Sequence, residues 1–229
     1  MCAIEPVPGR DGMWQRKSRA KRAAKPQLYC LCYNNTEYQA CNFAVCEGDR
    51  NALCVSCRQT RVLPDLSVPD NVHHWYRIEV AKRRLFYTLA KLDLHPMPVF
   101  EFLADTPGHQ VMTGHADGVI TLNIAEAEDE ERLHRRVALH EPYRTLLGHL
   151  RHESGHFYWD RLIRDGGHLE DFRAKFGDET PDYAQSLQRY YAAGGGAIAG
   201  WEAQHVSAYA TSHPWEDWAE TWPTTCTWW

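Results

Sequence analysis

Apolar residues recur at helical spacing in the stretch that begins near Trp75. The positions that share this spacing are Ile78, Ala81, Leu85, Leu89 and Leu92. Because they lie three or four residues apart, they fall on one face of a helix, and we expect an amphipathic helix over residues 74–93. Two shorter stretches, "VFEFLA" (99–104) and "GVITLNIAEA" (118–127), are apolar and rich in β-branched or aromatic residues. They predict strands.

A longer helix is expected to begin at Glu141-Pro142. Proline suits the first turn of a helix, and an acidic residue there interacts favourably with the helix dipole. This helix should run to about Asp165, where Gly166-Gly167 ends it. Other helices are expected over 128–140, as a charged surface helix, over 168–176 and 181–192, and from Pro214 onwards.

The first 27 residues have a different pattern, in which basic side chains alternate with little that could be buried. We interpret residues 1–27 as a disordered basic arm. A solvated tail is the simpler interpretation, and an electrostatic contact with nucleic acid is the alternative. A cysteine-rich module over 28–66 follows. Pro64 and Pro69 suit a linker between this module and the rest of the chain.

The composition is that of an ordinary globular protein. The chain has 229 residues, of which 44% are hydrophobic and 24% charged, enough for one substantial domain and a small module. A net charge of -5 gives no general nucleic-acid footprint. No apolar run approaches the ~20 residues that span a bilayer, and the N-terminus lacks the apolar core of a signal peptide. We therefore expect a cytoplasmic protein with no membrane contact.

Cysteines are concentrated in one short segment. Six of the eight fall within residues 30–57: Cys30, Cys32, Cys41, Cys46, Cys54 and Cys57. Without an export signal, such clustering favours metal ligands or free thiols over disulfides. Cys54-x-x-Cys57 has the spacing that lets two thiolates bind one zinc ion. The alternative is a set of reduced thiols in a loop-rich segment.

The candidate chemistry lies in "HLRHESGHFYWDRL", which contains His-Glu-x-x-His. His152 and His156 are four residues apart, so they share one face of a helix and can bind one ion. Catalytic zinc takes three protein ligands and keeps a position for water, and Glu153 lies where it could take a proton from that water. The alternative is a solvent-facing helix with a salt-bridged glutamate.

The third ligand must come from elsewhere. A pattern with a third histidine would need glycine at position 159 and histidine at 162, where this chain has Trp159 and Leu162. Asp160 lies ~12 Å along the helix axis from the first histidine, too far to share its ion, and should pair with Arg161 or Arg164. His149 could compete as a ligand, but Glu153 would then be misplaced as a base.

A later segment, "HPWEDWAET", offers the carboxylates of Glu216, Asp217 and Glu220. Glu216 and Glu220 share a helical face, so the first could bind zinc while the second hydrogen-bonds a ligand histidine. The alternative is a solvated acidic face. Three tryptophans flank these acids: Trp215, Trp218 and Trp222. They indicate a half-buried helix, on which acidic groups need partners.

Three long segments resemble a bacterial family of zinc-binding metallopeptidases: "TGHADGVITLNIAEAEDEER", "EPYRTLLGHLRHESGHFYWDRLIRD" and "VSAYATSHPWEDWAETW". The resemblance covers about residues 30–222. It implies an α+β protein: a small zinc-ribbon-like module over 28–66, then a mainly helical, zincin-like domain with a small mixed sheet over 72–229. The implied activity is that of a glutamate-zincin, which hydrolyses peptide or protein substrates with zinc-activated water.

The resemblance also implies roles for particular residues. In zincins a strand like 118–127 forms the sheet edge along which substrate lies. Some related zincins use a tyrosine upstream of the glutamate ligand to stabilise the oxyanion, and Tyr209 is the candidate here. A packed aromatic residue is the alternative.

A structural zinc is implied as well as a catalytic one. "CYNNTEYQACNF" followed by "CVSC" suggests four ligands: Cys32, Cys41, Cys54 and Cys57. Cys30 is too close to Cys32 for both to be ligands, and Cys46 is left over. Such a module could contact a protein or a nucleic acid, or it could cap the catalytic domain.

Two departures from the family lead to a second hypothesis. The pair of Cys-x-x-Cys knuckles that usually opens these proteins is replaced by the basic arm. After Trp222 the residues of this chain differ from those that continue the helix in the family. If one base is deleted from a possible coding sequence for the family's segment, its translation becomes residues 222–229 of this chain. We therefore expect a frameshifted C-terminus that shortens the last helix. The competing function is a zinc-ribbon interaction or nucleic-acid-binding protein with an inactive peptidase-like domain.

Overall fold

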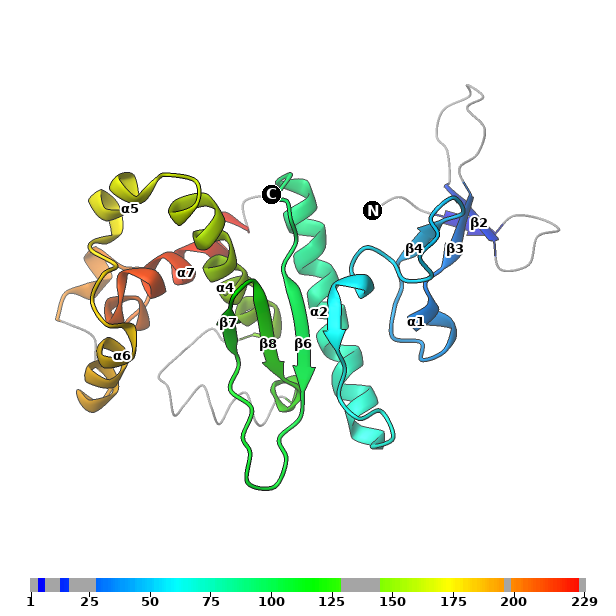
Figure 1. The fold of residues 1–229 in the computed structure, drawn as a ribbon, viewed down its shortest axis with the longest axis horizontal. Coiled ribbons are helices and arrows are strands. Elements are labelled where there is room, and N and C mark those ends of the chain that lie inside the picture. The colour runs from blue at the N-terminus through cyan, green and yellow to red at the C-terminus, as the bar shows by residue number, and fades with distance from the viewer. Residues whose placement is uncertain (1–3, 7–12, 17–27, 129–144, 196–198, 227–229) are drawn as a thin grey trace.

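The chain forms a small cysteine-rich module joined to a helical domain that is built on one sheet (Figure 1). The computed structural model describes residues 4–6, 13–16, 28–128, 145–195 and 199–226. Helices and two small sheets share the chain, so the predicted α+β class is confirmed. None of the described helices has both the length and the apolar composition that crossing a bilayer would require.

The first sheet is antiparallel and has the order β1-β2-β3-β4. Its strands are β1 (Ile4–Pro6), β2 (Met13–Arg16), β3 (Leu28–Leu31) and β4 (Ala44–Cys46), and the short helix α1 (Tyr33–Thr36) connects the last two. The prediction of a disordered arm is therefore wrong for β1 and β2. These segments pair because a strand edge offers backbone donors and acceptors that a neighbouring strand can satisfy. The rest of the arm lies outside the described residues.

The second sheet is mixed and has the order β5-β6-β8-β7. It contains β5 (Thr60–Val62), β6 (Val99–Leu103), β7 (Gly114–Ala116) and β8 (Val119–Asn123). β6 is parallel to β5 and β8, and β7 is antiparallel to β8. The sequence predicted that 118–127 would be the edge strand. Instead, β7 lies outside β8, because a tight turn at Asp117-Gly118, both with positive φ, folds β7 back alongside it.

Strand β8 also ends earlier than predicted. Asn123 caps a short 3-10 helix, η2 (Ile124–Ala127), by accepting a hydrogen bond from the Ala125 amide with its side chain. Asparagine competes in this way with the hydrogen bonds of a strand. The turn places Glu126 in the interior of the protein, where its side chain is 1% exposed.

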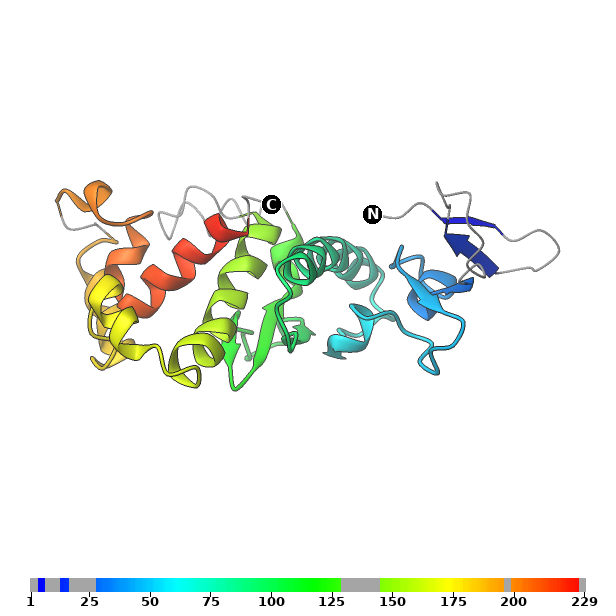
Figure 2. The ribbon, with the colours of Figure 1, turned by 90° about the horizontal axis from the view of Figure 1, so that it is seen from above.

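Two helices pack on the apolar face of the second sheet: α2 (Pro69–Lys91) and α4 (Leu146–Trp159). Figure 2 shows both on the same side of the strands. The alternate residues of β6 and β8 that face them are fully buried: Phe100, Phe102, Ile120 and Leu122. The predicted apolar face of α2 is buried too, and this helix begins five residues before the expected position, with proline at its N-terminus.

Helix α4 begins later than predicted. Thr145 is its N-cap, has an extended backbone, and accepts a hydrogen bond from the Gly148 amide with its side chain at 2.9 Å. A helix that began at Glu141 would have to include this extended residue, so that prediction is wrong. The predicted start and most of the surface helix 128–140 lie outside the described residues. After Trp159 the chain continues as a π-helical turn, η3 (Asp160–Arg164), close to the expected end.

The remaining helices have nearly the predicted bounds: α5 (Leu169–Phe176), α6 (Tyr183–Ala192) and α7 (Pro214–Thr225). Two short 3-10 turns, η4 (Trp201–Ala203) and η5 (Tyr209–Ser212), connect α6 to α7. Helix α7 lies directly against α4. A Cβ at Gly155 would be 3.0 Å from Cβ of Trp222, so this glycine permits the close approach of the two helices.

The cysteine-rich module is joined to the larger domain by buried polar contacts. β5 begins three residues after Cys57 and is a strand of the second sheet, so the predicted module contributes its last strand to the following domain. Thr60 Oγ1 lies 3.1 Å from Glu79 Oε1, which also pairs with Lys82 at 2.7 Å inside the protein. Arg83 donates to the Ala40 carbonyl at 2.8 Å. The module therefore packs against α2.

Candidate metal centre

Three side chains from α4 and α7 converge in the interior. Nε2 of His152 lies 3.2 Å from Nε2 of His156 and 3.2 Å from Oε2 of Glu216. Nε2 of His156 lies 3.5 Å from Oε1 of the same glutamate. His156 and Glu216 are almost fully buried, 4% and 1% exposed. The structure thus brings together the two motif histidines and the carboxylate that the sequence analysis selected.

The spacing of these atoms fits a tetrahedral zinc ion. Zinc binds imidazole nitrogen at ~2.0–2.1 Å, so two ligands of a tetrahedral ion lie about 3.3 Å apart. Oε2 of Glu216 is buried and faces Nε2 of His152. A buried carboxylate needs donors or a cation, and the two histidine nitrogens lie within 3.5 Å of this one. These three residues could hold a metal ion with one open position.

The pKa shifts of this cluster follow from burial and from mutual interaction. Burial alone would raise the pKa of Glu216, but His156, His152 and Tyr183 hold it at about 2. Burial lowers the pKa of His156, despite the charge of Glu216. For His152, burial is outweighed by the hydrogen bonds to Glu216 and Glu220, which raise its pKa well above the usual value. The Glu216 carboxylate is therefore ionised and available as a ligand.

Glu220 supports His152 from the side away from Glu216. Its Oε1 lies 2.7 Å from Nδ1 of His152, and its Oε2 accepts a hydrogen bond from Ser207 at 2.7 Å. When a metal ion replaces the proton on Nε2, a carboxylate on Nδ1 keeps the other proton on that nitrogen and so fixes the tautomer of the ring. Glu220, which the sequence analysis predicted to hydrogen-bond a ligand histidine, thus contacts His152. Ser207 was not predicted.

Glu153 lies beside the three converging residues but is not one of them. Its Oε1 is 3.1 Å from Nε2 of His149, and the side chain is buried. Burial would raise the pKa of Glu153, but the hydrogen bond from His149 and the nearby histidines lower it. The carboxylate is ionised and can act as a base. His149 also contacts Glu126, so the predicted competition for the metal does not arise in this arrangement.

Two tyrosines lie near Glu216. The Tyr183 hydroxyl on α6 donates to Oε1 of Glu216 at 2.6 Å, and burial raises the pKa of this phenol. The ring of Tyr209, the predicted oxyanion group, has its centre 6.3 Å from that of His152, and its side chain is hydrogen-bonded to Tyr183. The sequence analysis missed Tyr183. No local signal marks it, because it lies 33 residues before the carboxylate that it contacts.

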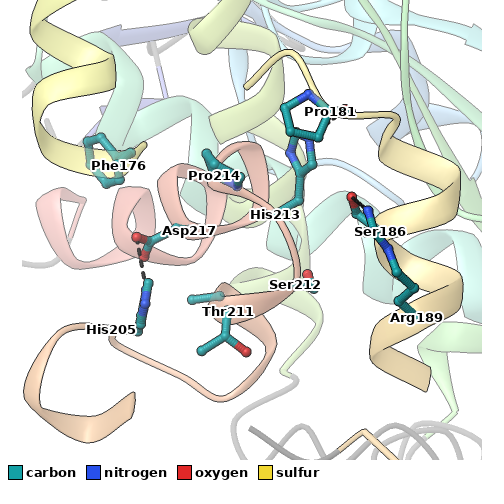
Figure 3. Close-up of a pocket in the computed structure, with 11 residues that line it drawn as sticks. Phe176, Pro181, Ser186, Arg189, His205, Thr211, Ser212, His213, Pro214 and Asp217 are labelled. Atoms are coloured by element: carbon teal, nitrogen blue, oxygen red, sulfur yellow. Dashed lines mark hydrogen bonds and ion pairs between the residues drawn. The ribbon is translucent and has the colours of Figure 1, made fainter. Parts of the chain in front are cut away.

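The carboxylates of Asp160 and Asp217, also considered as the third ligand, do not contact the two histidines. Asp160 pairs with Arg164 at 2.7 Å, as predicted. Asp217 lines a cavity of about 270 Å³ at the start of α7, where its carboxylate contacts Nδ1 of His205 at 3.0 Å (Figure 3). Burial raises the pKa of Asp217. It does not join the two histidines, and Glu216 is the residue of this segment that does.

A second cavity, of about 340 Å³, is lined by neighbours of the converging residues. Tyr183 and Trp215 form part of its wall, and the ring of Trp215 lies 4.0 Å from that of His156, centre to centre. His115 of the edge strand β7 also lines it and packs edge-on against Phe157 of α4. Its lining therefore includes both the edge of the second sheet and side chains that contact His156 and Glu216.

The cysteine module contains a second convergent group. The thiols of Cys32, Cys41, Cys54 and Cys57 are buried and lie within 4.8 Å of one another. Sγ of Cys41 and Sγ of Cys54 are 3.7 Å apart. Zinc–sulfur distances of ~2.3 Å place tetrahedral thiolates about 3.8 Å apart, so this group also fits zinc. The backbone amides of Phe43, Cys54 and Cys57 donate to its sulfur atoms. Cys30 and Cys46 lie outside it, on β3 and β4.

Comparisons with known proteins identify families for two segments of the chain. A family model described as "Putative zinc-binding metallo-peptidase" matches residues 71–226. A zinc-ribbon domain model matches residues 1–68 and so includes the stretch that we interpreted as a basic arm. Uncharacterised proteins of Mycobacterium tuberculosis (strain H37Rv) and Mycobacterium bovis are 42% identical over 200 residues. The match covers 83% of this chain but only 58% of those proteins. No solved structure matches.

Proposed function

The chain belongs to this zinc-binding metallopeptidase family, and from that premise we propose that it is a zinc-dependent peptidase of the glutamate-zincin type. The proposed ligands of the catalytic zinc are His152, His156 and Glu216, and the proposed general base is Glu153. The observation that carries the proposal is the convergence of the two imidazole nitrogens and the Glu216 carboxylate, with N–N and N–O distances of 3.2–3.5 Å and an ionised Glu153 beside them. A solvated helix face would leave these side chains in water.

Each residue has a distinct role in the proposed reaction. Zinc bound at this site would polarise a water molecule and lower its pKa towards ~7. Glu153, ionised and next to the ligands, takes the proton and later returns it to the leaving amine. Glu220 keeps His152 in the tautomer that presents Nε2 to the metal. Tyr183 holds Glu216 by a hydrogen bond, and Tyr209 is the proposed donor to the substrate oxygen that becomes negatively charged.

The substrate is proposed to lie along β7. Among the described strands, β7 is at the edge of its sheet, so its outer backbone groups can pair with an extended peptide. His115 of this strand lines the same cavity as Trp215, whose ring packs on His156, so we place a peptide on this edge close to the metal site. This geometry supports a peptide or protein substrate.

The cysteine module is proposed to hold a second, structural zinc. Four buried thiols with tetrahedral spacing support this assignment, as does the zinc-ribbon match. Because the module packs on α2, we propose that it stabilises the catalytic domain, and it could also contact a protein or nucleic acid. The competing function, binding by the zinc ribbon with an inactive peptidase-like domain, predicts zinc in the module and no hydrolysis.

Metal analysis combined with a cleavage assay tests the proposal. The zinc-loaded protein is incubated with a library of quenched-fluorescence peptides, and metal content is measured by mass spectrometry. We expect about two zinc ions per chain and a hydrolysis that stops on chelation and returns with zinc. One zinc per chain and no cleavage by the reloaded protein would favour the binding function instead.

A further inference from the structure

A line of three buried side chains leads from the second sheet to the proposed base. Glu126, His149 and Glu153 are 1%, 8% and 5% exposed. Nδ1 of His149 lies 2.5 Å from Oε2 of Glu126, and Nε2 of the same ring lies 3.1 Å from Oε1 of Glu153. Both ring nitrogens of His149 therefore face carboxylates, and the ring bridges the two glutamates.

This line is not a further metal site. The two carboxylates contact opposite nitrogens of one imidazole, so no single ion could bind His149 and both glutamates. Among the described residues, the groups with convergent ligand atoms are the four cysteines and the set of His152, His156 and Glu216. The bridging histidine is instead placed to hold a carboxylate.

The far end of the line is anchored in the sheet. Thr113 Oγ1 donates to Oε1 of Glu126, and the same hydroxyl accepts a hydrogen bond from the Asn123 amide at 3.0 Å. Asn123 also caps the turn that carries Glu126. Thr113 directly precedes β7, the proposed substrate strand. The position of Glu126 is therefore set by the sheet edge, and that of His149 by Glu126.

We propose that His149 is a positioning residue for Glu153, and that Glu126 fixes the ring of His149 for this task. The proposal rests on the proposed peptidase function. A glutamate side chain has three rotatable bonds, and a base must be held close to the productive geometry. The bond from His149 to Oε1 restricts the rotation of the Glu153 carboxylate and leaves Oε2 to take the proton.

The first test observes the bridge itself by NMR of the metal-free protein with 15N-labelled histidine. A ring N–H that donates to a buried carboxylate gives a downfield proton resonance that exchanges slowly with water. We expect this signal to vanish in His149→Gln and to move in both Glu126→Gln and Glu153→Gln. The control is His74→Gln, because His74 pairs with Glu128 at 2.9 Å outside the site. A signal that neither glutamate substitution moves would overturn the proposal.

The second test uses hydrolysis of a quenched-fluorescence peptide by the zinc-loaded protein. Loss of a residue that orients a group of a metal site typically lowers metal affinity or activity 10–100-fold. We expect kcat to fall by about that factor in His149→Gln and Glu126→Gln, with KM and zinc content unchanged and with an altered pH profile. His74→Gln should match the wild type. Because His149→Gln could fail to fold, the isosteric Glu126→Gln is the deciding variant.

The outcomes separate this proposal from the one on which it rests. A wild-type protein that binds zinc but cleaves no peptide overturns the peptidase function. A wild-type protein that cleaves, together with a folded Glu126→Gln variant of equal kcat and pH profile, overturns only the positioning role. Loss of zinc from His149→Gln with Glu126→Gln unchanged would make His149 a ligand and also overturn it.

Discussion

Nδ1 of His152 lies 2.7 Å from Oε1 of Glu220, a residue 68 positions later in the chain. The hydrogen bond links α4 to α7 and orients the first histidine of the motif. Glu216, one turn earlier on α7, meets the other nitrogen of the same ring at 3.2 Å. His152 is therefore held between two carboxylates, one proposed to share its metal and one to orient it.

Replacing Glu220 should weaken zinc binding without removing a ligand. Glu220→Ala deletes the acceptor that fixes the His152 tautomer, so we expect zinc affinity to fall by about 10–100-fold. Competition with a chromogenic chelator measures this affinity. Glu202→Ala, an exposed residue on η4, is the control and should have no effect. Equal affinities in the two variants would contradict the orienting role.

Glu153→Gln should abolish peptide hydrolysis while zinc stays bound. Glutamine keeps the shape of the base but cannot take a proton, and general-base catalysis contributes ~10²–10⁴-fold. Glu216→Gln should differ, because it weakens a proposed ligand and should lower zinc affinity as well. Metal content and cleavage rate are measured on both variants. Full activity in Glu153→Gln would exclude the mechanism, and unchanged zinc affinity in Glu216→Gln would exclude Glu216 as a ligand.

Gly155→Ala should push α4 and α7 apart. The added Cβ would lie 3.0 Å from Cβ of Trp222 and 3.1 Å from Cα of Ala219, so the backbone of α7 must move. Overpacking of this kind costs about 1–3 kcal/mol of unfolding free energy. Because Glu216 moves with α7, zinc affinity should fall too. Gly48→Ala is the control, since its Cβ would meet no atom within 4 Å. Chemical denaturation and chelator competition give both quantities.

Tyr183→Phe and Tyr209→Phe should have different effects. Tyr183 donates to Glu216 at 2.6 Å, so its loss should raise the pKa of that carboxyl and reduce zinc affinity several-fold. Tyr209 is the proposed oxyanion donor, so its loss should lower kcat by roughly 10²-fold with zinc retained. If Tyr183→Phe instead lowers kcat and keeps its zinc affinity, the two roles are exchanged.

Replacing Cys54 and Cys57 by serine should remove one of two bound zinc ions. We expect the module to lose stability while the site at His152 keeps its metal, because the two ligand sets share no residue. Since β5 follows Cys57 and pairs with β6, the unfolding temperature of the whole chain should fall as well. Cys46→Ser, outside the four-thiol group, is the control. Loss of both metals together would show that the sites are not independent.

Much of the local structure could be predicted from the sequence alone. The apolar spacing of α2, the bounds of α5 and α6 and the start of α7 depend on helical periodicity, which residues a few positions apart determine. The same periodicity placed His152 with His156 and Glu216 with Glu220. The choice of a carboxylate on a later helix followed from the demand of zinc for a third ligand, and the structure brings that carboxylate to the histidines.

Other contacts between segments far apart in the chain could not be predicted from the sequence. No periodicity connects His149 with Glu126, or Tyr183 with Glu216, because these pairs meet only when the helices pack against the sheet and against one another. The edge position of β7 and the inclusion of β5 in the second sheet depend on backbone pairing, which the side-chain pattern of a three-residue strand does not specify. Local spacing therefore determined which side chains could act as ligands, and helix packing decided which partners surround them.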